Sequence, residues 1–476
     1  MRIKPGVILP FVALTIGLMS AHGELRVGAA KVDVTGKIGA SQSGKYDHEH
    51  VYVRAIVLDN GSTRAALISV EGDNGGQPTI DAVARELECP AQNVIISSTH
   101  THSPKLTPPA APIQGGARSA VPGRARDAAF SEPILNAVKQ AKAKLQAARV
   151  GFGTGTSYLN VNRDGIDPET RKWIQYSNLD APSDKTVAVL TFEKPTGEPI
   201  AVYVNYAMHP INGYVVNIVS GDFAGAMSRY VEKAFGDNIV VAFTQGASGD
   251  QNPLYLRPSN DAMASRLGNP ITGFEINREK NEGPLRSVQY GVAEGEIPKA
   301  TEPDPKVVDN LFRFIESEGQ ILGEEVIRVM TWTPRWSSDV RIQGLEKDVS
   351  CPGRKRTNGN PFSAATREGV EGVYVDGPPR VYQIGVLGIG TTAVAWINGE
   401  IFTLIGQKTK RAAPLNDTMF STISNAVVGG YTPDDASYGK QTFQVLDSVV
   451  KPGCAETAIV KTIGELETQY LNLTGK

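Results

Sequence analysis

The sequence predicts an α/β fold, with a mixed β-sheet core, flanking helices, one large domain and a functional site at strand ends. Three observations support this prediction. Apolar strand patterns alternate with amphipathic helical patterns along the chain. No internal repeat or low-complexity linker divides the 476 residues. With 41% hydrophobic and 21% charged residues, the chain is long enough to bury one large core.

The N-terminal part of the mature chain alternates strands with a helix. A strand is predicted over residues 25–36, and a hairpin over residues 51–73 turns at the polar residues 59–62. The spacing of apolar residues predicts a helix over residues 79–88. A short buried strand over residues 92–97 follows and runs into polar residues, so we expect a strand end exposed to a cleft.

The rest of the chain continues the same alternation. Residues 106–125 are rich in Pro, Gly, Ala and Arg and predict a surface loop, and residues 252–303 are polar and irregular. The helix predicted over residues 304–330 could break at Gly319 or Gly323. The remaining predicted elements are helices over 130–146, 220–235 and 304–330, strands over 148–160 and 238–245, a hairpin over 185–210, and two strands from 380 followed by a helix from about 401.

Charge and hydropathy exclude two classes of partner. A net charge of −2 and a pI of about 6.4 leave no basic surplus for nucleic acid. Beyond the N-terminus, no segment approaches the roughly 20 apolar residues of a membrane span. We therefore expect a small-molecule or lipid substrate, no nucleic acid and no transmembrane segment, with peripheral membrane contact left open.

The N-terminus has the pattern of a secretory signal peptide. Arg2 and Lys4 precede an apolar stretch over residues 6–19, and small residues end near Gly23. A membrane anchor is the alternative, but the stretch is short for a span and contains Pro10. We predict a signal peptide over 1–23, a domain over 24–476, and a secreted or periplasmic protein.

The three cysteines are an odd number, so they cannot all pair within the chain. Cys351 and Cys454 lie in turn-like sequence and could form a disulfide in an exported protein, which would leave Cys89 free. Their spacing fits no zinc-binding pattern.

Two glycine-rich segments imitate known motifs without the required context. Residues 385–390 resemble a nucleotide-binding loop, but a β-branched run follows where a helix N-terminus is needed. We expect a hairpin turn there. Residues 246–250 resemble a nucleophile elbow, but Asp250 stands where that motif requires glycine. These mismatches argue against a nucleotide site and a serine-hydrolase triad.

Histidines gather at predicted strand ends. His100 and His102 follow a buried strand and alternate along a segment expected to be extended, so both should face one side. His209 ends another strand in the same way, and Glu400 ends a third apolar run. Side chains from several strand ends that meet at one edge suit a zinc site.

Other readings of these histidines stay open. His100 and His102 could be polar strand-end residues that hydrogen-bond to nearby loops. His48 and His50 also alternate, but they lie in a polar loop before a strand, so they form a weaker second candidate or a pocket rim.

Several segments together resemble the neutral/alkaline (non-lysosomal) ceramidases. The motifs that carry the histidines and Glu400 are "STHTHS", "NYAMHP" and "NGEIFT", in this order. The resemblance runs from Leu25 to the C-terminus, and its further motifs are "VGAAKVDVTG", "NVNRD", "VSGDFAG", "FTQGASGDQNP" and "GYTPDDASYGKQTFQ".

The resemblance implies an exported zinc-dependent amidohydrolase. By position, the zinc ligands would be His100, His209, Glu400 and Tyr431. His102 would handle protons beside the metal, and Arg163 would act in catalysis by contacting the substrate. Zinc would activate a water molecule and polarise the carbonyl of an N-acyl amide, as in the cleavage of ceramide to sphingosine and fatty acid or of a related N-acyl lipid.

Two departures from the family pattern affect these expectations. Asn252 stands where the family has a serine beside the substrate, so it can bind substrate but cannot act as a nucleophile. Ser248 does not take that position. Longer members of the family carry a C-terminal immunoglobulin-like domain, and since the sequence ends at Lys476 we expect that domain to be absent.

The first departure keeps other functions open. The chain could be a zinc hydrolase of a different amide, ester or lactone with a remodelled pocket around Asn252. It could also be a non-catalytic binding protein that retains the fold. His102 argues against the second alternative, because a binding protein has no need of a proton-handling residue.

Overall fold

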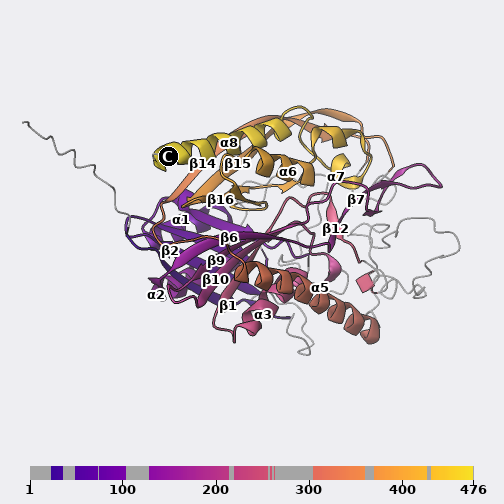
Figure 1. The fold of residues 1–476 in the computed structure, drawn as a ribbon. Coiled ribbons are helices and arrows are strands. Elements are labelled where there is room, and N and C mark those ends of the chain that lie inside the picture. The colour runs from indigo at the N-terminus through magenta and orange to yellow at the C-terminus, as the bar shows by residue number, and fades with distance from the viewer. Residues whose placement is uncertain are drawn as a thin grey trace, which may run out of the picture.

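Three β-sheets, each covered on its outer side by a pair of helices, surround a shared apolar core (Figure 1). This arrangement confirms the predicted mixed α/β fold with flanking helices. The computed structural model describes residues 23–35, 49–72, 74–102, 128–213, 219–255, 258–259, 262, 304–359, 369–425 and 430–474.

The elements follow one another in mixed order along the chain. The helices are α1 (Gly76–Leu87), α2 (Ala128–Ala143), α3 (Asp222–Ala234), α5 (Pro305–Thr331), α6 (Thr403–Ala412), α7 (Phe443–Leu446) and α8 (Ala455–Thr474). The strands are β1 (Arg26–Asp33), β2 (Tyr52–Asp59), β3 (Arg64–Val70), β4 (Val94–Ser98), β5 (Gln146–Ala147), β6 (Arg149–Thr156), β7 (Asn160–Ile166), β8 (Trp173–Asn178), β9 (Thr186–Glu193), β10 (Pro199–Tyr206), β11 (Val240–Gln245), β12 (Gln251–Pro253), β13 (Trp336–Ser337), β14 (Ile342–Arg356), β15 (Tyr374–Ile389), β16 (Thr392–Ile397), β17 (Glu400–Ile401), β18 (Asp417–Ser421) and β19 (Tyr431–Thr432).

The first sheet has the strand order β4-β3-β2-β1-β5. β2 and β3 form the predicted hairpin, and β4 joins β3 in parallel after α1 crosses over. Apolar side chains of α1 and α2 pack on one face, around Ile68, Val83 and Val138. The opposite face contributes Leu67 and Ile95 to the shared core. A sheet buried on both faces explains why these strands read as nearly continuous apolar runs.

The second sheet has the order β11-β10-β9-β6-β13, and α3 and α5 cover its outer face. α5 is continuous, so neither of its interior glycines breaks it. A Cβ at Gly319 would lie 2.4 Å from that of Ala226, and one at Gly323 would lie 2.6 Å from the Tyr230 ring. Both glycines therefore permit the close approach of α5 to α3.

The third sheet has the order β14-β15-β16-β18 and carries α6 and α8 on its outer face. β15 and β16 form the expected hairpin, in which Gly390 adopts a φ of 63°. Cys351 on β14 forms a disulfide with Cys454 next to α8, and Cys89 is free. This disulfide links the outer helix to the sheet that it covers.

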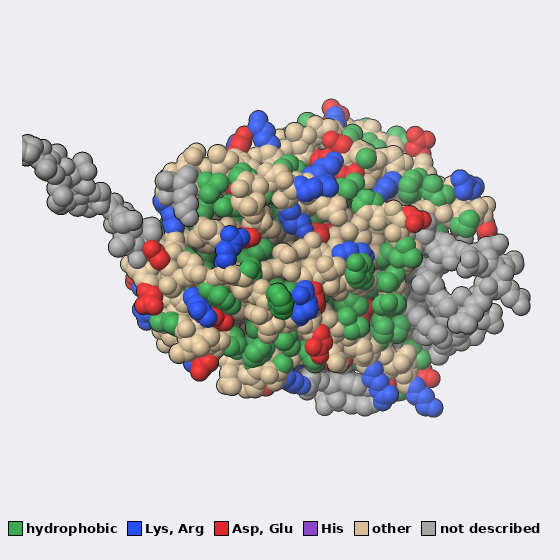
Figure 2. All heavy atoms as spheres, in the orientation of Figure 1, with side chains coloured by type: hydrophobic (Ala, Val, Ile, Leu, Met, Phe, Trp, Pro, Cys, Tyr) green, Lys and Arg blue, Asp and Glu red, His purple; other side chains and the backbone are tan. Residues whose placement is uncertain are grey.

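The surface of the protein carries charged side chains of both signs. In Figure 2, acidic and basic side chains alternate over the described face without a large field of one sign, as expected from a net charge of −2. No described helix is long and apolar enough to cross a membrane. Two small sheets, β12-β7-β8 and β17-β19, lie where strands of the larger sheets end, and they carry Arg163, Asn252, Glu400 and Tyr431 of the candidate site.

Candidate metal centre and active site

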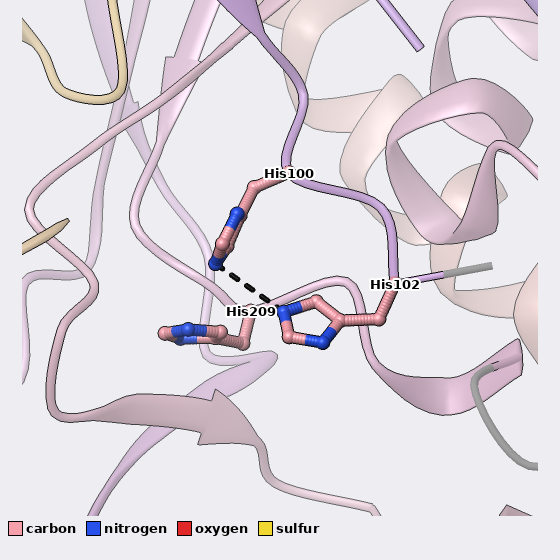
Figure 3. Close-up of side chains that lie close together, drawn as sticks. All are labelled: His100, His102 and His209. Atoms are coloured by element: carbon pink, nitrogen blue, oxygen red, sulfur yellow. Dashed lines mark hydrogen bonds between the residues drawn. The ribbon is translucent and has the colours of Figure 1, made fainter. Parts of the chain in front are cut away.

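Three histidines from two loops converge on one point (Figure 3). His100 and His102 follow β4, and His209 follows β10. Nε2 of His102 lies 3.3 Å from Nε2 of His100, and one ring nitrogen of each of the three histidines lies within 4.8 Å of the others. The predicted grouping of strand-end histidines is therefore present in the structure.

The backbone conformation that brings His100 and His102 together differs from the predicted extended segment. β4 ends at Ser98, and His100 has a φ of 67°, so the segment is not extended. This left-handed conformation is uncommon outside glycine. It turns the chain so that both rings reach the same point, which simple alternation along a strand would not have specified.

Contacts from neighbouring loops hold the turned segment. The backbone N–H of His100 donates to the hydroxyl of Ser98, and that of His102 donates to the carbonyl of Pro210. Between them, the Thr101 hydroxyl donates to the carbonyl of Ser220. The His100–His102 segment is thus attached both to its own strand and to the loop that carries His209.

His209 is oriented through its second ring nitrogen. Its backbone N–H and Nδ1 both approach the carbonyl of Gln251, Nδ1 at 3.0 Å, which fixes Nδ1 as the donor. Burial, together with the positive charge of Arg163, lowers the pKa of His209 to about 4. The ring is therefore neutral near pH 7, and its Nε2 lone pair faces the other site residues.

Glu400 faces two of these histidines. Its Oε2 lies 3.4 Å from Nε2 of His100 and 3.4 Å from Nε2 of His209. Burial alone would raise the pKa of the Glu400 carboxyl, but the neighbouring His100 holds it well below its usual value. Glu400 is therefore an ionised carboxylate beside His100 and His209.

Tyr431 is brought next to Glu400 by the backbone. β17 and β19 pair in parallel with Glu400 opposite Tyr431. The Tyr431 ring centroid lies 6.3 Å from that of His209. Burial and the negative charge of Glu400 raise the pKa of the Tyr431 hydroxyl. All four residues of the predicted ligand set thus lie in one region.

The donor set fits a metal ion. His209 Nε2 and Glu400 Oε2 are buried, and neither makes a hydrogen bond to another described residue. With the His209 ring neutral, two lone pairs face each other at 3.4 Å, an arrangement that a cation between them would relieve. Imidazole nitrogens with a carboxylate and a phenolic oxygen match the preferences of zinc. The distances also permit a set of three histidines.

Arg163 lies beside this cluster and is almost fully buried. Its guanidinium donates to the carbonyl of Gly249 at 2.5 Å and to Oδ1 of Asn252 at 3.3 Å. It also stacks against the rings of Tyr431 and Phe443, with its Cζ 5.3 and 5.2 Å from their centroids. The arginine therefore links the tyrosine to the loop that carries Asn252.

In the loop over residues 247–252, the role of Asp250 is the feature that the sequence did not predict. The Asp250 carboxylate accepts from the backbone N–H of Thr403 and from the side chain of Asn162, each at 2.8 Å. Gly249 donates its N–H to the carbonyl of Ile401, next to Glu400. The glycine-rich "GASGD" segment was the available signal, since such a loop allows close backbone approach.

The other candidate residues contact other parts of the chain. His50 is exposed and pairs with Asp33 at 2.9 Å, and His48 lies outside the described residues. The Ser248 hydroxyl accepts a hydrogen bond from Gln245. Asn252 lies on β12 opposite Val161, where the Arg163 contact orients its side-chain amide.

Comparison with known proteins gives a consistent result. A family model described as neutral/alkaline non-lysosomal ceramidase, N-terminal, matches residues 25–376. A solved structure titled ceramidase complexed with C2 has a TM-score of 0.63 at 16% identity, covering 94% of this chain and 75% of that chain. Neutral ceramidase from Pseudomonas aeruginosa has a TM-score of 0.62 at 16% identity, with the same coverage. At this identity the structures share a fold.

Proposed function

The chain belongs to the neutral/alkaline, non-lysosomal ceramidase family, and we propose that it is an exported, zinc-dependent amidohydrolase. Its substrate would be ceramide, cleaved to sphingosine and fatty acid, or a related N-acyl lipid. The membership confirms the resemblance inferred from the ordered motifs. The proposal adds the metal, the residue roles and the export of the protein.

One observation carries the proposal. Glu400 Oε2 faces Nε2 of both His100 and His209 at 3.4 Å, and the facing atoms of Glu400 and His209 make no hydrogen bond to any residue in the described part of the chain. Burying lone pairs against one another in this way is unfavourable without a cation. We assign His100, His209, Glu400 and Tyr431 as the zinc ligands.

The remaining residues would divide the work of amide hydrolysis. Bound zinc would polarise the amide carbonyl and lower the pKa of a water molecule. His102 Nε2, 3.3 Å from His100, lies at the edge of the cluster, where it would accept a proton from the attacking water and return it to the departing amine. The products would be a carboxylate and an amine.

Arg163 and Asn252 would act on the substrate side of the site. The guanidinium contacts the Tyr431 ring and the Asn252 amide, so it would set the orientation of both. A positive charge at this position also favours the negative charge that develops on the carbonyl oxygen during hydrolysis. Asn252 would bind a polar group of the substrate through its amide.

A second candidate function follows from Asn252. An asparagine is larger than a serine and offers an amide in place of a hydroxyl, so it would favour a different amide, an ester or a lactone in a remodelled pocket. The Arg163 contact, which holds the Asn252 side chain in one orientation, favours this specificity role.

A substrate comparison tests both candidates. Purified protein would be assayed on fluorogenic ceramide, short-chain N-acyl amides and esters, before and after removal and return of zinc. The proposal expects zinc-dependent amide hydrolysis with ceramide or an N-acyl lipid preferred. Preference for short amides or esters, shifted toward ceramide by Asn252→Ser, would support the second candidate. No hydrolysis of any substrate with zinc restored would contradict both.

Export is a separate part of the proposal. Residues 1–23 would be removed as a signal peptide, which leaves a catalytic domain over 24–476. The Cys351–Cys454 disulfide supports this view, because disulfides persist in oxidising compartments. N-terminal sequencing of protein from the medium or periplasm should begin near Glu24. Full-length protein retained in the cytoplasm would contradict export.

A further inference from the structure

Two buried carboxylates lie beneath the His209 loop, apart from the site described above. Asp222 begins α3 and Glu318 lies in the middle of α5, and these two helices pack side by side (Figure 1). Asp222 is 0% exposed and Glu318 is 1% exposed. The proposed mechanism uses neither carboxylate.

Asn212 connects the two acids. Its side-chain N–H donates to Oε2 of Glu318 at 2.6 Å. The carboxylate of Asp222 accepts from three backbone N–H groups, those of Gly213 at 2.8 Å, Phe223 at 2.7 Å and Asn212. The amide oxygen of Asn212 in turn accepts from the hydroxyl of Ser259 at 2.8 Å. The carboxylates of Asp222 and Glu318 and the hydroxyl of Ser259 therefore all lie next to Asn212, whose own amide oxygen is a further possible ligand.

The charge of this group is not balanced by the side chains around it. Within the described ranges, no lysine, arginine or histidine forms an ion pair with Asp222 or Glu318, and Oε1 of Glu318 has no hydrogen-bond partner. Burial raises the pKa of Asp222 to about 6, and burial with the charge of Asp222 raises the pKa of Glu318 well above its usual value.

Neither protonation state satisfies Glu318. If Glu318 is ionised, the protein buries two negative charges without a counter-charge, which is strongly unfavourable. If Glu318 is protonated on Oε1, the new O–H would need an acceptor, and in the described structure no hydrogen bond is made at Oε1. A positive ion bound to Oε1 would remove both problems.

We propose that Asp222, Glu318 and Asn212 form a binding site for a hard divalent cation of the Ca²⁺ or Mg²⁺ type. The available donors are all oxygen atoms, which these ions prefer, whereas zinc favours the nitrogen-containing cluster. Two carboxylates would neutralise one divalent ion, and water would complete its coordination. The proposal does not depend on the proposed hydrolase activity.

The location gives the ion a role in supporting the histidines. Asn212 lies three residues after His209, and Asp222 donates its backbone N–H to the hydroxyl of Ser220. The carbonyl of Ser220 accepts the Thr101 hydroxyl between His100 and His102. A cation at the acid pair would therefore fix both loops that carry the cluster.

A cation titration tests the site on the whole protein. Metal would be stripped with a chelator, one equivalent of zinc returned, and CaCl₂ or MgCl₂ added at pH 8 during thermal unfolding. We expect a saturable rise of the unfolding midpoint and one further ion per chain by elemental analysis. At about 100 times its dissociation constant, the ion should lower the unfolding equilibrium constant roughly 100-fold.

Two variants assign the effect to this site. Glu318→Gln should abolish the saturable shift, and Asp222→Asn serves the same purpose if the first variant does not fold. Glu467→Gln is the matched control. Glu467 lies on α8, is also buried, and accepts hydrogen bonds from the Leu415 N–H and the Thr418 hydroxyl. This variant should retain the whole shift.

Two results would contradict the cation site. A wild-type protein that shows no saturable stabilisation by either ion at pH 8 would mean that Glu318 is simply a protonated acid. A shift that survives in both Glu318→Gln and Asp222→Asn would place the ion elsewhere. His209→Ala, which removes a proposed zinc ligand, should keep the rise of the unfolding midpoint with Ca²⁺ or Mg²⁺. The test can therefore be interpreted even if the zinc proposal is wrong.

Discussion

Two sides of the candidate site differ in what their polar atoms contact. On the histidine side, formed by His100, His102, His209 and Glu400, the facing atoms of His209 and Glu400 make no hydrogen bond within the described structure. On the arginine side, formed by Arg163 with the loop 247–252, the two terminal nitrogens of Arg163 donate to the carbonyl of Gly249 and to the side-chain oxygen of Asn252.

We infer from this difference that the histidine side binds a ligand and that the arginine side supports its geometry. Unsatisfied buried atoms that converge are stabilised only when something binds to them, whereas satisfied ones hold a fixed geometry. We therefore expect changes on the histidine side to act on metal and catalysis first. Changes on the arginine side should act on geometry and stability first.

The largest expected effect comes from removing a metal ligand. His209→Ala deletes a neutral imidazole whose Nε2 faces Glu400, so the protein should lose bound zinc, and amide hydrolysis should fall to background. Zinc per chain and initial rates measure this. His50→Ala, which alters an exposed histidine paired with Asp33, is the control and should keep both. Full zinc content in His209→Ala would remove His209 from the ligand set.

The next effect separates binding from chemistry on the histidine side. His102→Ala should lower kcat by about 10²–10⁴-fold, the usual contribution of a general acid–base group, while zinc content stays unchanged. Steady-state kinetics with parallel zinc analysis measure the split. If zinc is lost together with activity, His102 is a ligand and the three-histidine set is correct.

A smaller effect is expected on the arginine side. Arg163→Lys keeps the charge but cannot reproduce the planar contacts with Gly249, Asn252 and the Tyr431 ring. Because Arg163 orients a proposed ligand, zinc affinity or activity should fall by about 10–100-fold. Competition with a zinc chelator and thermal unfolding measure the two consequences. Unchanged zinc affinity with a raised KM alone would leave Arg163 its contact with the substrate and would contradict its support of Tyr431.

The smallest effect is a pH dependence of stability. Burial and the charge of Asp164 raise the pKa of Asp250 to about 6. The stability that this group contributes is complete below its unfolded pKa of about 3.9 and is lost as pH rises through about 6. Asp250→Asn stays neutral, so the free energy of unfolding of the wild type should fall relative to this variant across that range.

Glu400 should show the opposite sign in zinc-free protein. Its pKa lies well below the usual value, so its contribution is present above the unfolded pKa and is lost as pH falls. Urea unfolding of zinc-free wild type, Asp250→Asn and Glu400→Gln at a series of pH values compares the two sides directly. Parallel curves for wild type and Asp250→Asn would show that Asp250 is not perturbed.

Much of the fold followed from local patterns. The β2–β3 and β9–β10 hairpins and the helices α1 and α3 have strong periodicity and clear turns, so they were predictable. The long pair β14–β15 was not fully recognised. Its strands are partly exposed and contain Pro352, Gly353 and Pro378, which read as turns in the sequence but form an irregularity in the register.

The site was predictable in composition but not in geometry. The ends of apolar runs located His100, His102, His209 and Glu400, and the order of motifs located Tyr431. The positive φ of His100 depends on contacts from distant loops, which no local pattern encodes. The pairing of Glu400 with Tyr431 joins segments that are separate in the sequence.

A crystal structure of zinc-loaded protein, with anomalous diffraction recorded at the zinc edge, tests the central proposal most directly. We predict one strong peak bound by nitrogen atoms of His100 and His209 and by oxygen atoms of Glu400 and Tyr431, with His102 beside the ion and not bound to it. A zinc ion held elsewhere, or none after zinc loading, would contradict the assignment of this cluster as the catalytic metal centre.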